Sequence, residues 1–214
     1  DPLWSRGLGD VYKRQHIREG VLWSLVYCGF FDRMDPNGRT WPGAKSIEEA
    51  IQRLIAAERQ IDDPATPLTG WAFDPIYYGN RRMTRNDLDR VSRDRPIGIY
   101  HASGHIMNVN TRALELVDWM RPGIEHPGIP LGDDGLPLGE LKGPQAMTPM
   151  GRHVGLDRSA LDGSESGFRD FARLCVRAGV TTVTDLSSLL PQPNLEMFLR
   201  VTAEPAFPAR VVAF

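Results

Sequence analysis

A short apolar run that ends abruptly in polar side chains is the feature that most constrains this sequence. Residues 97–100 read Ile-Gly-Ile-Tyr, which is typical of a short buried strand. The ten residues that follow carry a group of polar side chains: His101, Ser103, His105, Asn108 and Asn110. An apolar helix start follows over 111–116, with Asn110 as its N-cap. Parallel α/β proteins keep their active sites in such strand-to-helix loops, so we expect a functional site here.

Strand and helix signals alternate along much of the remaining chain. In the first half we expect a buried helix within 16–28, a helix behind the capping box of Ser46 and Glu49, a strand over 68–73 and a short helix capped by Thr84. In the second half we expect a helix over 164–178 ended by Gly179, a strand over 180–184, a helix near 194–202 and a strand from 209. This order predicts parallel βα units with right-handed crossovers.

The fold class expected from this alternation is α/β, as a partial TIM-type (β/α) barrel with an inserted loop-rich α+β segment. Residues 121–138 are rich in proline and glycine, which predicts irregular surface structure or a small hairpin there. A complete barrel needs about 250 residues, so we expect residues 16–214 to be a barrel domain truncated at both ends. Residues 1–15 have no periodicity and are interpreted as a non-native leader.

Bulk composition excludes several classes of protein. The 214 residues carry a formal net charge of −2 and no basic run, which argues against a nucleic-acid partner. The longest mostly apolar run, 20–31, is too short to cross a bilayer, and no signal peptide is legible. Cys28 and Cys175 are far apart and belong to no CxxC motif, which predicts reduced buried thiols in a cytoplasmic protein.

Two residue pairs could carry chemistry. His101 and His105 are four residues apart, a spacing that suits zinc on a helix. Ser103 and Gly104 lie between the two histidines and a strand precedes them, so a helix is not expected here. The favoured interpretation is that one histidine forms hydrogen bonds in a loop and the other belongs to the core. Glu140 could ligate a metal, as could Lys142 if carbamylated to supply carboxylate oxygens. From residue type alone, a solvated ion pair in a turn is the favoured interpretation of this second pair.

Two further positions depend on their place in the fold. Asp185 follows the predicted strand over 180–184, where it would lie on the catalytic face of a barrel or cap the next element. Aromatic residues between Trp71 and Tyr78 could line a substrate pocket, although most such side chains belong to cores.

Several segments together resemble one family, the metal-dependent amidohydrolases of the YtcJ-like, amidohydrolase 3 branch, which includes N-substituted formamide deformylase. The matching segments are DRPIGIYHASGHIMNVNTRAL at 94–114, DGLPLGEL at 134–141, AGVTTVTD at 178–185, and HIREG at 16–20 leading into GFFDR at 29–33. The resemblance covers residues 16–214. It implies a barrel fold and a divalent metal ion, with zinc expected.

The resemblance also implies roles for individual residues. His16 resembles the second histidine of the family's metal-binding His-x-His pair, whose first position here is Arg14. Glu140 or Lys142 would be the other metal ligand, with the choice between them open. The implied catalytic residues are His105 and Asp185, and the implied substrate-binding residues are His101, Asn110 and Trp71.

The function implied is hydrolysis of amide-type, non-peptide C–N bonds by metal-activated water. The expected partner is a small-molecule substrate, with no nucleic acid and no membrane; self-association into a homo-oligomer is left open. Two alternatives remain. The chain could be a catalytically incomplete part of such an enzyme, or an α/β module that binds a small ligand at the His101 and His105 loop without turnover.

Overall fold

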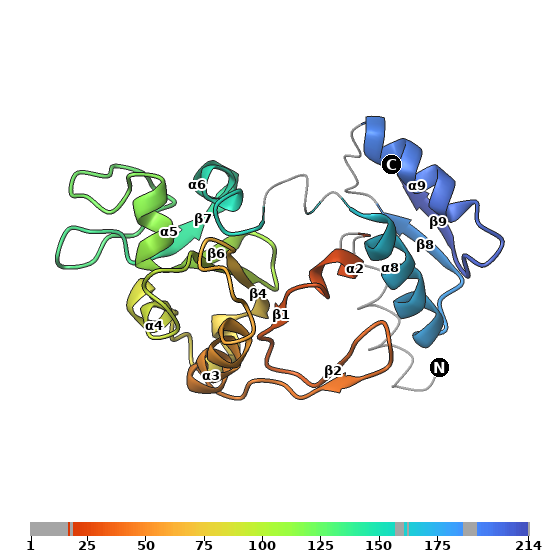
Figure 1. The fold of residues 1–214 in the computed structure, drawn as a ribbon, viewed down its shortest axis with the longest axis horizontal. Helices are drawn as coiled ribbons and strands as arrows, with labels where there is room; N and C mark the ends of the chain where they lie inside the picture. Colours follow the sequence, from red (N-terminus) through yellow and green to blue (C-terminus); the bar gives the residue numbers. More distant parts are fainter. Residues whose placement is uncertain (1–16, 18, 157–160, 162, 186–191, 214) are drawn as a thin grey trace. The chain divides into compact units, whose positions relative to one another are not determined.

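The structure is a computed structural model that describes residues 17, 19–156, 161, 163–185 and 192–213 (Figure 1). The predicted leader and His16 lie outside the described residues. The chain divides into two compact units. One contains the described residues of 1–24, 34–40 and 159–214, and the other contains 25–33 and the described residues of 41–158. The prediction of one barrel domain over 16–214 stays a prediction.

The larger unit is built on a five-stranded sheet in the order β1-β4-β5-β6-β7. Its strands are β1 (Val26–Tyr27), β4 (Leu68–Phe73), β5 (Ile97–His101), β6 (Ile106–Val109) and β7 (Glu140–Lys142). β1, β4 and β5 pair in parallel, whereas β6 pairs antiparallel with both β5 and β7. The carboxyl ends of β1, β4 and β5 therefore meet at one edge of the sheet.

Helices and a short 3₁₀ segment complete this unit (Figure 1). They are α3 (Ile47–Glu58), η1 (Pro75–Tyr78), α4 (Arg85–Asp89), α5 (Thr111–Leu116) and α6 (Gly143–Gly151). A two-stranded sheet pairs β2 (Arg33–Met34) with β3 (Thr40–Trp41), where the sequence passes from one unit to the other and back. No helix among the described residues is long and apolar enough to cross a membrane.

The core of the larger unit forms where α3 packs against the sheet. The buried stripe of α3 contributes Ile47, Ala50, Ile51 and Leu54, which the sequence pattern predicts. Ser46 caps the helix by accepting a hydrogen bond from Glu49 N at 3.1 Å. The Glu49 carboxylate returns to Lys45 N rather than to Ser46 N, so the reciprocal half of the predicted capping box is displaced by one residue.

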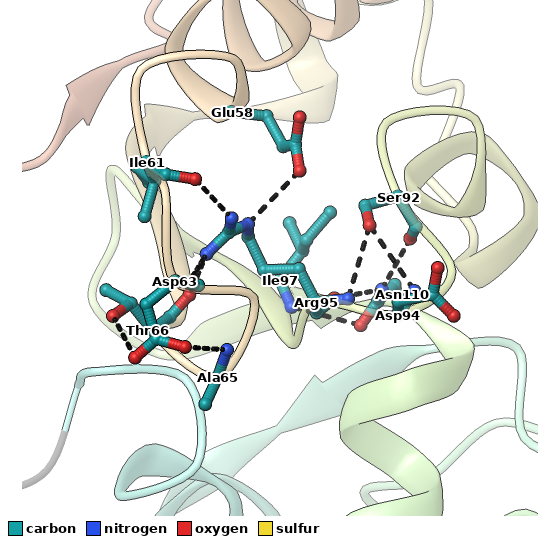
Figure 2. Close-up of polar contacts among 10 residues, drawn as sticks. All are labelled: Glu58, Ile61, Asp63, Ala65, Thr66, Ser92, Asp94, Arg95, Ile97 and Asn110. Atoms are coloured by element: carbon teal, nitrogen blue, oxygen red, sulfur yellow. Dashed lines mark hydrogen bonds and ion pairs between the residues drawn. The ribbon is translucent and has the colours of Figure 1, made fainter.

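Buried polar groups fix the start of β5 (Figure 2). The guanidinium of Arg95, which is 2% exposed, donates to the carbonyls of Ile61, Asp63 and Thr66 and pairs with Glu58 at 3.3 Å. These bonds satisfy the loop that follows α3, where no regular ladder is present. Arg95 therefore ties the start of β5 to the end of α3.

Asn110 joins the same region to α5. Its Oδ1 accepts from Ile97 N at 3.0 Å and Ala113 N at 3.1 Å, and its Nδ2 donates to the carbonyls of Ser92 and Arg95, both at 2.9 Å. The predicted N-cap is confirmed. The same side chain also closes the loop before β5 (Figure 2).

The smaller unit contains α2 (Glu19–Leu22), α8 (Glu165–Arg177), β8 (Thr182–Asp185), α9 (Gln192–Thr202) and β9 (Arg210–Ala213), with β8 and β9 parallel. Its buried residues include Ile17, Phe168, Phe171, Cys175, Val183, Phe198 and Val201. Gly20 allows α2 and α8 to approach closely, because a Cβ at this position would lie 1.9 Å from the Gly167 carbonyl oxygen. Gly179, which the sequence predicts as the residue that ends α8, has the left-handed φ of 68°. Both cysteines are free and buried, as predicted.

Two predictions are confirmed only in part. The helix expected within 16–28 ends at Leu22, because Val26 and Tyr27 pair with Gly70 and Trp71 in the sheet. The expected strand-loop-helix after Ile97 contains a further strand, β6, whose backbone pairs on both sides. Tertiary ladder bonds override local spacing in both cases. α6 was not predicted, since glycine and two prolines obscure its pattern.

The α/β class is confirmed in its coarse form, as a mixed α/β fold whose central sheet has parallel β1, β4 and β5. β6 and β7 follow β5 by antiparallel pairing, so this part of the chain is not a succession of βα units. The partial TIM-type barrel stays a prediction.

Replacing Arg95 by Met should destabilise the protein. Three carbonyls and Glu58 would lose their buried partner, at a cost on the order of 3 kcal/mol. Urea unfolding followed by circular dichroism measures the change. Arg90→Met is the matched control, because Arg90 pairs with Glu48 at the surface and its side chain is 49% exposed. Equal losses of stability in the two variants would contradict a special role for Arg95.

Candidate functional site

Four of the predicted polar positions project from one face of the sheet. Asn108 is paired with Ile99 on β5 and with Glu140 on β7, so these three side chains share a face. His101 lies two residues after Ile99, and Lys142 lies two residues after Glu140. The alternation of the strands therefore brings His101, Asn108, Glu140 and Lys142 to the same face.

His101 is buried as a neutral imidazole. It ends β5 at 3% exposure, and its Nε2 hydrogen-bonds Asn108 Oδ1. Because Asn108 Nδ2 donates to Met83 O at 2.7 Å, Oδ1 is the acceptor and Nε2 carries the proton. Burial lowers the pKa of His101 below its ordinary 6.5, while the Asn108 hydrogen bond and the Glu140 charge oppose this shift.

Glu140 is a buried carboxylate between two cations. Its Oε2 lies 2.7 Å from Arg82 Nη1, and its Oε1 lies 3.1 Å from Lys142 Nζ. Oε1 accepts no directed hydrogen bond from the described residues, so the contact with Lys142 is an ion pair alone. The carboxylate is 4% exposed, whereas Arg82 and Lys142 are 51% and 42% exposed. Two cations against one carboxylate leave this cluster with a surplus positive charge at the surface.

Glycine at position 139 allows β7 to begin where it does. Gly139 has φ 94°, and a Cβ there would lie 2.5 Å from the carbonyl oxygen of Val109. Arg85 fixes the preceding loop, donating its N–H to Leu138 O at 2.6 Å and pairing with Asp134 at 2.6 Å. Glu140 is thus positioned by a glycine and a buried arginine.

The carboxyl end of β4 carries backbone strain beside this cluster. Ala72 has φ 73°, an unusual conformation for a residue with a side chain, and the register with β5 shifts between Trp71 and Phe73. The Phe73 ring packs edge-on against His101 at 5.2 Å. Asp74 then caps η1 through Ile76 N. Bulges of this kind occur frequently next to active sites.

Other predicted site residues have different surroundings. His105 is exposed in the turn between β5 and β6, where its carbonyl accepts from Gly143 N at 2.9 Å. Asn110 is fully buried, and its amide group already makes the four bonds described above. Trp71 is buried beside Tyr27, with the Arg33 guanidinium 5.4 Å from its ring. Their catalytic and substrate-binding roles stay predictions, and the contacts of Asn110 favour a structural one.

Asp185 ends β8 in the smaller unit, as the strand prediction requires. It is 2% exposed, and its Oδ2 accepts from Ile17 N at 2.9 Å. Its catalytic role stays a prediction. His16, the predicted metal ligand, lies outside the described residues.

The described residues do not by themselves fit a metal ion. They contain no group of three or more His, Cys, Asp or Glu side chains that could hold one. The carboxylate predicted as a ligand, Glu140, is already neutralised by Arg82 and Lys142. A carbamate on Lys142 would place a second negative charge beside that carboxylate. The choice between Glu140 and Lys142 as metal ligand stays a prediction.

Sequence reasoning missed two members of the cluster. The sequence does not single out Arg82, because its partner Glu140 is 58 residues away. Asn108 was noted as polar but given no role, because the expected loop hid its position inside a strand. Residues 106–109 read Ile-Met-Asn-Val, which shows no polar–apolar alternation, so no local signal places Asn108 on the face of His101.

The fold and the cluster together define a mixed α/β protein with a charged site beside its strand ends. The sequence model of the Amidohydrolase family matches residues 34–213, which is most of the chain. The chain therefore belongs to the Amidohydrolase family.

Two solved structures resemble the chain. One is an uncharacterized metal-dependent hydrolase from Pyrococcus horikoshii OT3, with TM-score 0.55 and 21% identity over 94% of this chain. The other is an uncharacterized metal-dependent hydrolase from Pyrococcus furiosus, with TM-score 0.51 and 16% identity over 94% of this chain. The matches cover 35% and 36% of those proteins, so this chain spans about a third of their length. At these identities the likeness concerns the fold. No functionally curated protein matches the sequence.

His101→Gln should flatten the pH dependence of stability on the acid side of neutrality. Since the folded pKa of His101 lies below the unfolded value, the unfolded chain binds more protons as the pH falls below about 6.5. The wild-type protein should lose stability there, by up to about 1.4 kcal/mol per pH unit from this group. Urea midpoints at pH 7 and pH 5 for both proteins measure the effect. An identical slope in His101→Gln would contradict a buried neutral imidazole.

Proposed function

We propose that this chain is part of a hydrolase that cleaves C–N bonds of small, non-peptide amides. The observation that carries the proposal is the Amidohydrolase family match over 34–213. The charged cluster adds support, because it lies beside the carboxyl ends of β4 and β5, the edge at which open α/β sheets bind ligands.

The exposed cations of the cluster suit the chemistry of amide cleavage. Attack on an amide carbonyl places negative charge on its oxygen, and preorganised N–H donors stabilise that charge. Lys142 and Arg82 are half exposed, and buried Glu140 holds both in place. In this proposal Lys142 donates to the carbonyl oxygen, while Glu140 positions Lys142. The neutral His101, held by Asn108, keeps a further positive charge out of the cluster.

A divalent metal ion in the whole protein, zinc by prediction, remains part of the proposal. Two proteins of similar fold bear the name metal-dependent hydrolase, which supports it. Because the described residues do not fit such an ion, its ligands would have to include groups outside them, with His16 the predicted one.

The second candidate function is binding of a small ligand without turnover. The observation that favours it is that Glu140, the predicted metal ligand, already forms ion pairs within the chain. A catalytically incomplete part of an amidohydrolase would also bind a ligand without turnover. Measuring turnover distinguishes an active hydrolase from both of these alternatives.

Lys142→Met should lower kcat/KM for amide hydrolysis by about a hundredfold, the usual cost of removing one donor to the carbonyl oxygen. Amine or ammonia release from a panel of small amides, with added zinc and with a chelator, measures the rate. Arg112→Met is the matched control, because Arg112 is 41% exposed on α5 and pairs only with Glu115 among the described residues.

The unfolding midpoint of each variant must be measured beside its rate, since Lys142→Met also removes a counter-charge from Glu140. An equal loss of activity in Arg112→Met would contradict the role given to Lys142. Absence of turnover from the wild-type chain under every condition would contradict hydrolysis by this chain and leave the two alternatives, a catalytically incomplete part and a module that binds a ligand without turnover.

A further inference from the structure

Arg82 has unused hydrogen-bond donors in the candidate site. Its guanidinium contacts Glu140 through Nη1, at 2.7 Å. Arginine carries five N–H donors in a planar group, and the N–H of Nε lies parallel to one N–H of Nη2. Among the described residues, neither Nε nor Nη2 of Arg82 has a hydrogen-bond or ion-pair partner. The side chain is 51% exposed, so a molecule from solvent can reach this pair of donors.

Contacts on both sides of the side chain hold Arg82 in place. Met83, the next residue, is buried, and its carbonyl accepts from Asn108 Nδ2 at 2.7 Å. This bond ties the backbone beside Arg82 to β6. The carboxylate of Glu140, which is 4% exposed, holds the guanidinium at the other end. A donor that is ordered in advance loses less conformational freedom when a ligand binds.

The solvent-facing part of the cluster is cationic. Glu140 is buried, whereas Arg82 and Lys142, the two cations that face it, are about half exposed. His101 is neutral, because burial lowers its pKa. Asp74 also acts on His101, and its carboxylate caps η1 through a backbone N–H. Within the group of Glu140, Arg82 and Lys142, one positive charge therefore remains unmatched.

The two cations offer different donors to one molecule. Both contact the same carboxylate, so a small molecule can reach both. Lys142, which pairs with Ile106 at the start of β6, carries a compact charge with rotatable donors that suit a single oxygen. Arg82 presents two parallel donors in a plane, which suit a group with two oxygens.

We propose that the Nε and Nη2 donors of Arg82 bind a carboxylate of the substrate. The inference rests on the proposed function and narrows its substrate class to small amides that carry a carboxylate. The two oxygens of a carboxylate match the two parallel donors, and its single charge matches the unmatched charge of the cluster. A phosphate group carries nearly two negative charges at neutral pH, which exceeds that charge beside the buried Glu140.

Binding of succinamate and succinamide to the 214-residue chain tests the inference, with affinities measured by NMR titration. These probes share an amide and a chain length, and differ in whether the far end is a carboxylate or a second amide. We expect succinamate to bind at least about tenfold more tightly, as a hydrogen-bonded charge pair allows. Succinamate should also shift the Nε–H resonance of Arg82, which is assigned by its loss in Arg82→Lys, whereas succinamide should not.

Arg82→Met should bring the ratio of the two affinities close to one. Arg82→Lys keeps the charge without the parallel donors and should lose most of the preference. Arg112→Met is the matched control and should keep the wild-type ratio, because Arg112 is 41% exposed and pairs only with Glu115 among the described residues. The unfolding midpoint of each variant is measured beside its affinities, and the comparison of probes on the wild type depends on no variant.

Equal affinity of both probes for the wild type would overturn the inference, as would an unchanged ratio in folded Arg82→Met. A full preference in Arg82→Lys would contradict binding through the parallel donors. Tighter binding of inorganic phosphate than of succinamate would also overturn the carboxylate. Preference for succinamate without turnover of any amide would retain the carboxylate site while refuting hydrolysis by this chain. Hydrolysis of succinamide as fast as succinamate would do the reverse.

Discussion

The buried guanidinium of Arg95 is the interaction on which the larger unit depends. It satisfies three loop carbonyls after α3 and a carboxylate of that helix, while Asn110 completes the same region from the start of α5. A buried cation is tolerated when it is paired and hydrogen-bonded, as Arg95 is. Because both residues lie at the start of β5 or just after β6, they fix the two strands that carry His101 and Asn108.

Burial and charge compete in the candidate site, and the balance explains its arrangement. Burying the Glu140 carboxylate would be costly alone, so two cations face it and remain partly in water. A third positive charge at His101 would add repulsion from Arg82, and burial keeps that imidazole neutral. The result is a rigid carboxylate with two solvent-facing donors, an arrangement suited to stabilising negative charge at the edge of the sheet.

Strain and exposure also gather at this edge. Ala72 holds a left-handed conformation at the end of β4, and Phe31, Ile76 and Tyr77 leave large apolar side chains in water. Neither feature helps the stability of the fold. The strained segment is next to the charged cluster, because the Phe73 ring that follows Ala72 contacts His101.

The sequence by itself determined the local elements and the family. Ser46, Thr84 and Asn110 cap helices where predicted, because capping depends on residues a few positions apart. The apolar runs at 68–73 and 97–100 form strands as expected. Only the tertiary structure decided that 106–109 is a strand and that Arg82 meets Glu140. Those outcomes depend on strand pairing and on an ion pair between residues 58 positions apart, which no local pattern encodes.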